Sequence, residues 1–343
     1  MKILKYLLFL ILIVIIGGAI YFGTKDGTYD LSNSHEINAP ISLVFNKVTN
    51  LKEWAEWGPW KEKDSSITFS YGEIAQGEGA SYSWDGDTMD GSLKTTSVSE
   101  NKEVLQDLTI QTPAGDRFLK GYWKFEENEG VTNITWGMKG EHTLMDKVYY
   151  ALSGMDFNGE INTMQKAGLA NIEKVIQSDM AKFTVNVEGV KEHGGGYYLY
   201  LTASSKISEI GDKMAPMMGT VAGYMAQRQI AFAGMPFTIY NVIDQQNGTV
   251  IFSTAIPVTE RIETEAGFQV LCGFMQPTAA VKTILKGNYN NLDMAYALGH
   301  EYLIENNIPK NNDRPMFEIY ANDPGDFPSP ADWETHIYIP ILN

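Results

Sequence analysis

Hydrophobic and polar residues follow three different patterns along this chain. An uncharged stretch near the start consists mainly of Leu, Ile, Val and Phe. Between about 35 and 178, apolar and polar residues alternate in short runs separated by Gly, Asp and Asn, which is typical of antiparallel strands joined by tight turns. From about 180 onward, similar strands flank two segments with helical periodicity. The pattern therefore predicts an α+β protein that begins with an apolar helix.

The uncharged stretch Tyr6–Thr24 predicts a transmembrane anchor over residues 1–24. As a helix it would span about 28 Å, close to the hydrocarbon thickness of a bilayer. Lys2 and Lys5 precede the span, and the positive-inside rule then places the N-terminus in the cytoplasm and the remaining chain outside. The small residues of Gly17-Gly18-Ala19 leave an alternative, which is export after signal cleavage.

A polar tether over 25–34 is predicted to lead into a first globular stretch over 35–178. Its pattern begins with a strand at 35–40 and a helix at 42–48, and it ends with a long helix at 164–176. Between these helices the alternation predicts six strands, at 67–71, 80–84, 91–98, 103–110, 121–126 and 132–139. Helix, strands and final helix together describe a curved sheet wrapped on a helix.

This first stretch resembles the START-like polyketide-cyclase superfamily, also called SRPBCC, which has a helix-grip fold. The matching residues are Ala39-Pro40-Ile41-Ser42-Leu43-Val44-Phe45, Trp54, Trp57, Pro59, Trp60, Gly77–Trp84 and Thr132–Trp136. The resemblance implies a deep apolar cavity between the sheet and its last helix. The three closely spaced tryptophans either pack in the core or line that cavity.

The second globular stretch, 179–343, repeats one pattern twice. Met235–Tyr240 is followed by Phe252–Val258, and Arg314–Tyr320 is followed by Thr335–Ile341. Helices are predicted before each pair, at 205–231 and 289–307, and strands before each helix, at 183–188, 197–202, 268–275 and 278–285. We therefore predict two strand-helix-strand-strand repeats that share one sheet, with a ligand groove at their pseudo-twofold axis.

The repeat is similar to the GyrI-like, or transcription-activator effector-binding, family. The carrying residues are Gly234–Tyr240, Ala255–Val258, Gly287-Asn288-Tyr289, Phe317–Pro324 and Tyr338–Ile341. The resemblance implies binding of drug-like, often cationic, amphipathic molecules by tyrosines around a buried carboxylate, and some members are hydrolases. The family's His-x-Gly-Pro-Tyr is Leu285-Lys286-Gly287-Asn288-Tyr289 here, so a role for that histidine is absent.

One glutamate breaks the symmetry of the repeat. Residues two apart in a strand share a face, so Glu318 and Tyr320 correspond to Thr238 and Tyr240 in the first copy. The apolar pairs on the other face are predicted to pack against the helices: Phe237 with Ile239, and Phe317 with Ile319. A glutamate buried without a partner is costly. Glu318 is therefore exposed at an edge, bonded to a tyrosine hydroxyl, or ready for a positively charged ligand.

Aromatic residues around this carboxylate complete the predicted ligand site, since tyrosine offers a ring face to cations and a hydroxyl to polar groups. The predicted ligand-binding residues are Glu318, Tyr320, Tyr240, Tyr289, Tyr338 and Trp333. Packing in the core is the alternative for each tyrosine. His300 and His336 are read as exposed or hydrogen-bonded histidines rather than acid-base groups.

Charge and composition exclude several other functions. With 26 Lys and Arg against 42 Asp and Glu, the net charge is −16, which argues against nucleic acid. The five histidines are scattered and Cys272 is the single cysteine, so the sequence offers no metal site, disulfide or cofactor motif. We find no catalytic constellation and assign no catalytic residue.

These observations predict a membrane-anchored binding protein for small amphipathic, possibly cationic, molecules. It would act as a sensor, a sequestering module or a carrier. Two alternatives remain open. One is a hydrolase of a small electrophilic compound that uses Glu318 as a general base. The other is a lipid carrier that uses the cavity implied for 35–178.

Overall fold

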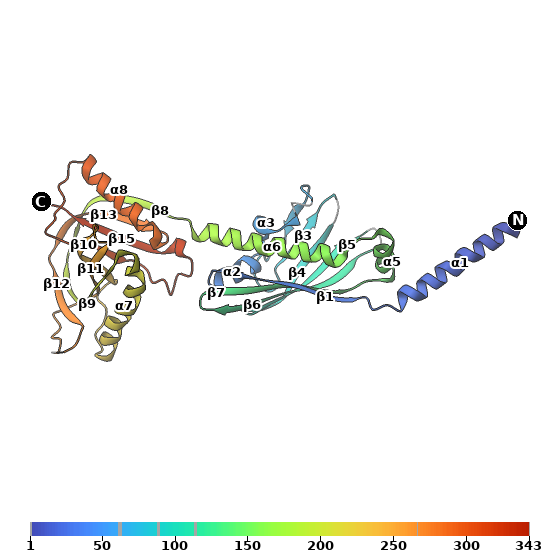
Figure 1. Cartoon of the computed structure of the whole chain (residues 1–343), viewed down its shortest axis with the longest axis horizontal. Helices are drawn as coiled ribbons and strands as arrows, with labels where there is room; N and C mark the ends of the chain where they lie inside the picture. The colour runs from blue at the N-terminus through green and yellow to red at the C-terminus, as the bar shows by residue number, and fades with distance from the viewer. Residues whose placement is uncertain (1, 61–63, 88–89, 113–114, 266, 343) are drawn as a thin grey trace. The chain divides into compact units, whose positions relative to one another are not determined.

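The chain divides into two compact units, Met1–Ser178 and Asp179–Asn343, each with its own antiparallel sheet (Figure 1). The structure is a computed structural model that describes residues 2–60, 64–87, 90–112, 115–265 and 267–342. The mixed α+β class and the two antiparallel sheets confirm the class predicted from the alternating pattern.

The chain begins with helix α1 (Lys2–Gly23). Its segment Ile3–Gly23 is long and apolar enough to cross a membrane or to serve as a signal sequence, and it is the one such helix in the described part of the chain. Four residues separate this helix from strand β1 (Thr28–Ile37). The predicted polar tether over 25–34 therefore needs correction, since most of it is a strand.

The first unit is a seven-stranded sheet in the order β1-β7-β6-β5-β4-β3-β2. Besides β1, its strands are β2 (Thr68–Tyr71), β3 (Ser81–Asp85), β4 (Asp90–Ser99), β5 (Glu103–Gln111), β6 (Arg117–Asn128) and β7 (Val131–Glu141). Its further helices are α2 (Ile41–Thr49), α3 (Trp54–Trp57), α5 (Leu144–Ser153) and α6 (Phe157–Met180). The sequence pattern predicted six of these strands between its two helices, but it did not predict α3 or α5.

Helix α6 lies along one face of this sheet (Figure 1), and stacked tryptophans fill the space beneath it. The rings of Trp123 and Trp136 stack 4.7 Å apart, and Trp57 meets both edge-on. Trp57 is fully buried and Trp54 almost so. At Gly168 of α6, a Cβ atom would lie only 2.7 Å from the Trp136 ring. Of the two predicted roles for the closely spaced tryptophans, the structure shows core packing for Trp54 and Trp57.

The second unit is an eight-stranded sheet in the order β12-β9-β11-β10-β14-β15-β13-β8. Its strands are β8 (Thr184–His193), β9 (Gly196–Lys206), β10 (Phe237–Asp244), β11 (Thr249–Val258), β12 (Leu271–Met275), β13 (Thr278–Lys286), β14 (Met316–Tyr320) and β15 (Glu334–Pro340). Its helices are α7 (Ile210–Gln227) and α8 (Leu292–Glu305), with short 3-10 turns η1 (Ile207–Glu209), η2 (Tyr289–Asn291) and η3 (Pro330–Asp332).

Each repeat contains one strand more than the predicted strand-helix-strand-strand unit. The first copy runs β8-β9-α7-β10-β11 and the second runs β12-β13-α8-β14-β15. The first strand of each copy pairs with the other copy, because β8 pairs with β13 and β12 pairs with β9. The two copies are therefore interlocked by an exchange of their first strands.

The copies meet where β10 pairs with β14. In this antiparallel ladder Phe237 pairs with Ile319, Thr238 with Glu318, and Ile239 with Phe317. Exchanging the two copies turns this ladder into itself and leaves the Thr238–Glu318 pair in place. That pair therefore lies on the pseudo-twofold axis of the second unit.

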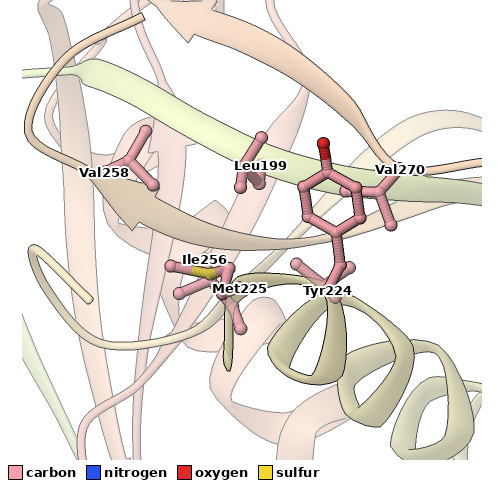
Figure 2. Packing of buried hydrophobic residues seen from close by; sticks show 7 residues of the cluster. Leu199, Tyr224, Met225, Ile256, Val258 and Val270 are labelled. Carbon is pink, nitrogen blue, oxygen red and sulfur yellow. The ribbon is translucent and has the colours of Figure 1, made fainter. Parts of the chain in front are cut away.

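Both helices pack on the sheet face that carries Glu318. Helix α7 covers β9 and β11, where Val221 and Met225 contact Leu199 and Ile256 (Figure 2). Helix α8 covers β13, β15 and β8, and its Ala295 and Leu303 join a separate apolar cluster. The central strands β10 and β14 therefore lie between the two helices.

The prediction that the apolar pairs of β10 and β14 pack against the helices is wrong. Phe237, Ile239 and Phe317 lie on the opposite face, in a cluster with Ala255 and Tyr338. Only two residues join β8 to β9, although these strands lie near opposite edges of the sheet. The sheet must therefore curl, and the curl buries the face that carries no helix.

Candidate functional site

Glu318 is the central feature of the helix-covered face, because its side chain is only 1% exposed. The hydroxyl of Tyr296 on α8 donates to its Oε1 at 2.8 Å, and the hydroxyl of Tyr320 lies 3.1 Å from its Oε2. Tyr240 of β10 also donates a hydrogen bond to this carboxylate. Three phenol groups from two strands and one helix thus surround a single buried carboxylate.

Tyr320 connects the carboxylate to the rest of the seam between the helices. Its hydroxyl lies 3.1 Å from Oγ1 of Thr238 and 3.0 Å from the sulfur of Met214 on α7. A phenol has one proton to donate, and the carboxylate is the strongest acceptor within reach, so the Tyr320 hydroxyl donates to Glu318. Met214 bounds the site on the α7 side, and Tyr296 bounds it on the α8 side.

Within the described part of the second unit, Glu318 is surrounded by neutral hydrogen-bond donors and not by cationic side chains. Burial raises the pKa of Glu318 above its ordinary value of 4.5, and the hydrogen bonds from the three tyrosines oppose that rise. Burial, reinforced by the negative charge of Glu318, holds the pKa of Tyr240, Tyr296 and Tyr320 well above 10. These hydroxyls therefore remain protonated donors at every physiological pH. Among the residues that the structure describes, no lysine, arginine or histidine forms an ion pair with Glu318.

Two further predicted residues lie beside Tyr320. The Tyr289 ring is 5.7 Å from the Tyr320 ring in an edge-on contact, and the Trp333 ring is 4.9 Å from the Tyr289 ring. Burial, with a smaller effect from the Glu318 charge, raises the pKa of Tyr289 to about 12. Trp333 is fixed by its indole N–H, which donates to the carbonyl of Phe327 at 2.8 Å. These rings extend the aromatic site from the buried carboxylate to half-buried positions.

The loop that positions Tyr289 depends on Gly287. This residue has a φ of +141°, and a Cβ atom there would lie 2.3 Å from the Cβ of Phe183. Its amide donates to the carbonyl of Trp333 at 2.8 Å. The next residue, Asn288, caps the turn η2 by accepting from the amide of Asn290. Where the resembling family has a histidine and a proline, this chain therefore fixes the loop with a glycine contact and an asparagine cap.

Tyr338 is not brought together with the other predicted residues. It pairs across the sheet with Phe317, and the two rings stack 4.7 Å apart and nearly parallel on the face without helices. His193 meets both rings edge-on. Glu318 pairs instead with Ile337, which lies on the α8 side. The predicted set thus gathers Glu318, Tyr320, Tyr240, Tyr289 and Trp333 and leaves Tyr338 behind the sheet.

The remaining polar candidates lie apart from the Glu318 cluster. Nε2 of His336 lies 2.6 Å from Oε1 of Glu334, and burial lowers the pKa of His300. The thiol of Cys272 is half-buried and lies 3.4 Å from the amide of Ile262. No group of three or more His, Cys, Asp or Glu residues in the described part of the chain is placed to hold a metal ion.

Sequence reasoning missed Tyr296, whose hydroxyl lies 2.8 Å from Oε1 of Glu318. A signal for it was present in the helix register. Ala295, Gly299 and Leu303 are spaced at four residues and form the face of α8 that lies on the sheet. Tyr296 directly follows Ala295, so it lies at the border of this buried face. From there its side chain reaches Glu318 on the central strand β14.

A depression of about 440 Å³ lies elsewhere, on the face of the first sheet that points away from the tryptophan core. Its charged side chains neutralise one another, since Lys120 pairs with Asp107 and Lys139 with Asp30. The hydroxyl of Tyr122 also donates to Asp30 at 2.8 Å. This depression therefore has no preference for either sign of charge, and the Glu318 cluster is the stronger candidate.

Comparison with known proteins gives fold-level likenesses only. No family model matches the chain, and no curated protein sequence matches it. Among solved structures, the EcmrR C-terminal domain is 18% identical, with 47% of this chain and 98% of that chain covered and a TM-score of 0.38. The EcmrR–DNA complex is 14% identical, with 60% of this chain and 86% of that chain covered and a TM-score of 0.39. Protein Ms6760 from Mycobacterium smegmatis is 15% identical, with 43% of this chain and 91% of that chain covered and a TM-score of 0.32. At such identities and TM-scores, these likenesses establish neither a family nor a ligand.

Proposed function

We propose that this chain is a membrane-anchored binding protein for a small, amphipathic, positively charged molecule. The second unit would be a GyrI-like effector-binding domain, and the first a START-like domain that carries it. The ligand site would consist of Glu318 with Tyr320, Tyr240, Tyr289 and Trp333. Such a protein acts as a sensor, a sequestering module or a carrier.

The buried carboxylate, which has no cationic partner among the described residues, is the observation that carries this proposal. Removing an ionised carboxylate from water costs several kcal/mol, and hydrogen bonds from neutral hydroxyls offset only part of that cost. An organic cation would supply the missing positive charge. The faces of Tyr289 and Trp333 would add cation–π attraction, which is strongest where water is excluded. Charge and aromatic surface together favour an apolar cation over a metal ion.

Binding must open the site, because Glu318 is 1% exposed without a ligand. The partly buried residues of the site carry the side chains that would move aside: Tyr240, Tyr289, Tyr296 and Trp333. We infer that the ligand replaces the hydroxyl of at least one tyrosine next to the carboxylate. The cost of that exchange selects against cations that cannot provide aromatic or apolar contact.

The proposed anchor is α1, with the N-terminus in the cytoplasm and both units outside the membrane. Support comes from the length and apolar character of Ile3–Gly23 and from the lysines that precede the span. Export after signal cleavage is the alternative for the same segment. In either case the ligand site would meet molecules on the far side of the membrane.

Fluorescence anisotropy with two dyes on one ring system tests the ligand proposal. Rhodamine 123 is a cation and fluorescein is an anion, and both are xanthenes. The full chain in nanodiscs should bind rhodamine 123 and not fluorescein. Glu318→Gln should weaken rhodamine binding by about 30-fold or more, since it removes one partner of a buried charge pair.

Glu301→Gln is the matched control, because it makes the same change on the exposed side of α8. It should leave rhodamine affinity unchanged and correct for dye that partitions into lipid. Equal affinity of the Glu318→Gln and Glu301→Gln chains would remove Glu318 from the site. Preference for fluorescein over rhodamine 123 would refute a cationic ligand.

A hydrolase using Glu318 is the second candidate, and the raised pKa of this carboxyl is the observation that favours it. A carboxyl with a raised pKa is a better proton acceptor than an ordinary glutamate. Incubation of the chain with a panel of small esters and epoxides, followed by mass spectrometry, tests this candidate. Product that depends on Glu318 would establish turnover. If every substrate stays unchanged, the hydrolase is refuted and ligand binding remains as the proposed function.

A further inference from the structure

Helix α5 presents apolar residues to solvent along one side. None of its residues is buried. Met145, Tyr149 and Leu152 are 63%, 59% and 82% exposed, and their spacing of four and three residues places them on one helical face. Two further exposed apolar residues lie near this helix. Phe118, which is 76% exposed, follows Arg117 on β6, and Arg117 bonds to Asp146 of α5. Met155, which is 43% exposed, comes two residues after the end of α5.

The exposure of α5 does not reflect a poorly fixed helix. Thr143 and Asp146 form a reciprocal capping box at its start, and Gly154 in the left-handed conformation ends it. The guanidinium of Arg117 on β6 donates two hydrogen bonds of 2.9 Å to the two carboxylate oxygens of Asp146. The chain therefore holds an apolar helix face in a defined position, and that face has no protein partner in the described part of the chain.

The position of α5 is tied to the end of α1. The ammonium of Lys147 donates to the carbonyl of Lys25, and Lys25 follows Gly23, the last residue of α1, by two positions. Two extended residues span about 7 Å, which is comparable to the depth of one headgroup layer. Figure 1 shows α5 at the end of the sheet where β1 begins. A bilayer crossed by α1 must therefore reach the neighbourhood of α5.

We propose that α5 is an interfacial helix whose Met145–Tyr149–Leu152 face inserts into the lipid headgroup layer beside α1. This inference rests on the proposed membrane anchor. The short stretch of chain from α1 to Lys25, and the hydrogen bond from Lys147 to Lys25, favour lipid over a second protein copy because they keep α5 close to the end of α1. Tyrosine and basic residues beside an apolar stripe are the composition expected at that depth. The first unit would then be held on the bilayer at two points.

Site-specific fluorescence in the full chain tests this placement. In a Cys272→Ser background, single cysteines at Leu152, Leu12 and Glu100 are labelled with the environment-sensitive dye NBD. The chains are reconstituted into vesicles of phosphatidylcholine and phosphatidylglycerol. Some vesicles also contain phosphatidylcholine with a nitroxide quencher near the headgroup end of its acyl chain. Leu152 is 82% exposed, so its replacement leaves the fold intact.

The label at Leu152→Cys should emit at shorter wavelength than the label at Glu100→Cys, and nitroxide lipid should quench most of its emission. Glu100 lies in the turn at the far end of β5, about 30 Å from the strand end nearest α5, and its label should be unaffected. The label at Leu12→Cys reports on the anchor itself and should also be shielded from water.

Each contrary outcome identifies which idea fails. A lipid-embedded label at Leu12 with a water-exposed label at Leu152 would overturn the interfacial helix and leave the anchor standing. Emission from Leu152 at short wavelength without nitroxide quenching would show a protein contact there, and would also overturn it. A water-exposed label at Leu12 would refute the anchor, and the interfacial helix with it.

Discussion

Replacing Tyr296 by phenylalanine tests whether Glu318 is a buried charge held by phenol donors. The substitution removes only the hydroxyl that donates to Oε1 of Glu318 at 2.8 Å, and it keeps the ring in the seam. Tyr320 and Tyr240 still donate to the same carboxylate. The change therefore isolates one of three hydrogen bonds without creating a cavity larger than an oxygen atom.

The expected cost follows from the charge state of Glu318. A hydrogen bond to a charged group contributes about 1.5–3 kcal/mol, against about 1 kcal/mol for one between neutral groups. The pKa of Glu318 is raised above 4.5 by burial, so the ionised form accumulates in the folded chain only as the pH rises through that raised value. Tyr296→Phe should therefore destabilise the second unit by about 1 kcal/mol at low pH and by about 1.5–3 kcal/mol at high pH.

Hydrogen exchange followed by mass spectrometry resolves this effect from the rest of the chain. Peptides from β10 and β14 report the opening free energy of the second unit, and peptides from β5 and β6 serve as an internal control. The measurement compares the wild-type chain, Tyr296→Phe, Glu318→Gln and the double variant at several pH values. The cycle gives the coupling between the two side chains directly.

The reasoning would be refuted by a cost that does not change with pH and that persists fully in the Glu318→Gln background. Such a result would mean that Tyr296 stabilises the seam through its own packing. A cost that vanishes in the Glu318→Gln background would confirm that the hydroxyl acts on the carboxylate.

Three further outcomes are expected. An acid whose folded pKa is raised loses stability as the pH rises from its ordinary value through the raised one, so Glu318→Gln should unfold at a progressively higher urea concentration than the wild type as the pH increases. Gly168→Ala should destabilise the first unit by about 1–3 kcal/mol because the added Cβ would lie 2.7 Å from a tryptophan ring, whereas Gly219→Ala, with open space on α7, should stabilise by about 0.5–1 kcal/mol in the same thermal melt. Burial tends to raise the pKa of Asp146, but the hydrogen bonds from Arg117 and from the start of α5 outweigh it, and the pKa is lowered from 3.8. The stabilisation from this carboxylate is present above pH 3.8 and is lost as the pH falls through the lowered pKa. Asp146→Asn should therefore cost about 1 kcal/mol at neutral pH and nothing at a pH below that lowered pKa, as measured by exchange of the α5 amides.

Alternation of apolar and polar residues was sufficient to predict most of the strands, and its failures have physical causes. Strand β1 was missed over most of its length because two positions on its half-buried side, Asn33 and His35, are polar and interrupt the alternation. Asn33 of this strand donates to Asn162 and Gln165 on α6, and His35 lies 2.7 Å from Glu173. A strand that contacts its helix through hydrogen bonds has the composition of a linker. Helix α5 was missed for the opposite reason, since its apolar residues do not point to a core.

The site was predictable in part. Period-two spacing correctly placed Glu318 and Tyr320 on one face, and the comparison of repeats correctly matched Glu318 with Thr238. Spacing alone does not tell which face a helix covers, and here the curled sheet buries both faces. Phe237 and Phe317 therefore looked like helix contacts although they pack inside the curl. Tyr296 reaches the carboxylate from another element, and no local pattern around Glu318 contains it.

The exchange of first strands between the two copies has a consequence for how such a site could arise. A polypeptide with one copy would complete its sheet only by associating with an identical molecule, and the central position would then be occupied twice by the same residue. Two glutamates at that point would repel each other, and two threonines would leave no charge. Joining both copies in one chain frees the two central positions to diverge. It is this fusion that permits a solitary negative charge at the centre of an otherwise symmetric architecture.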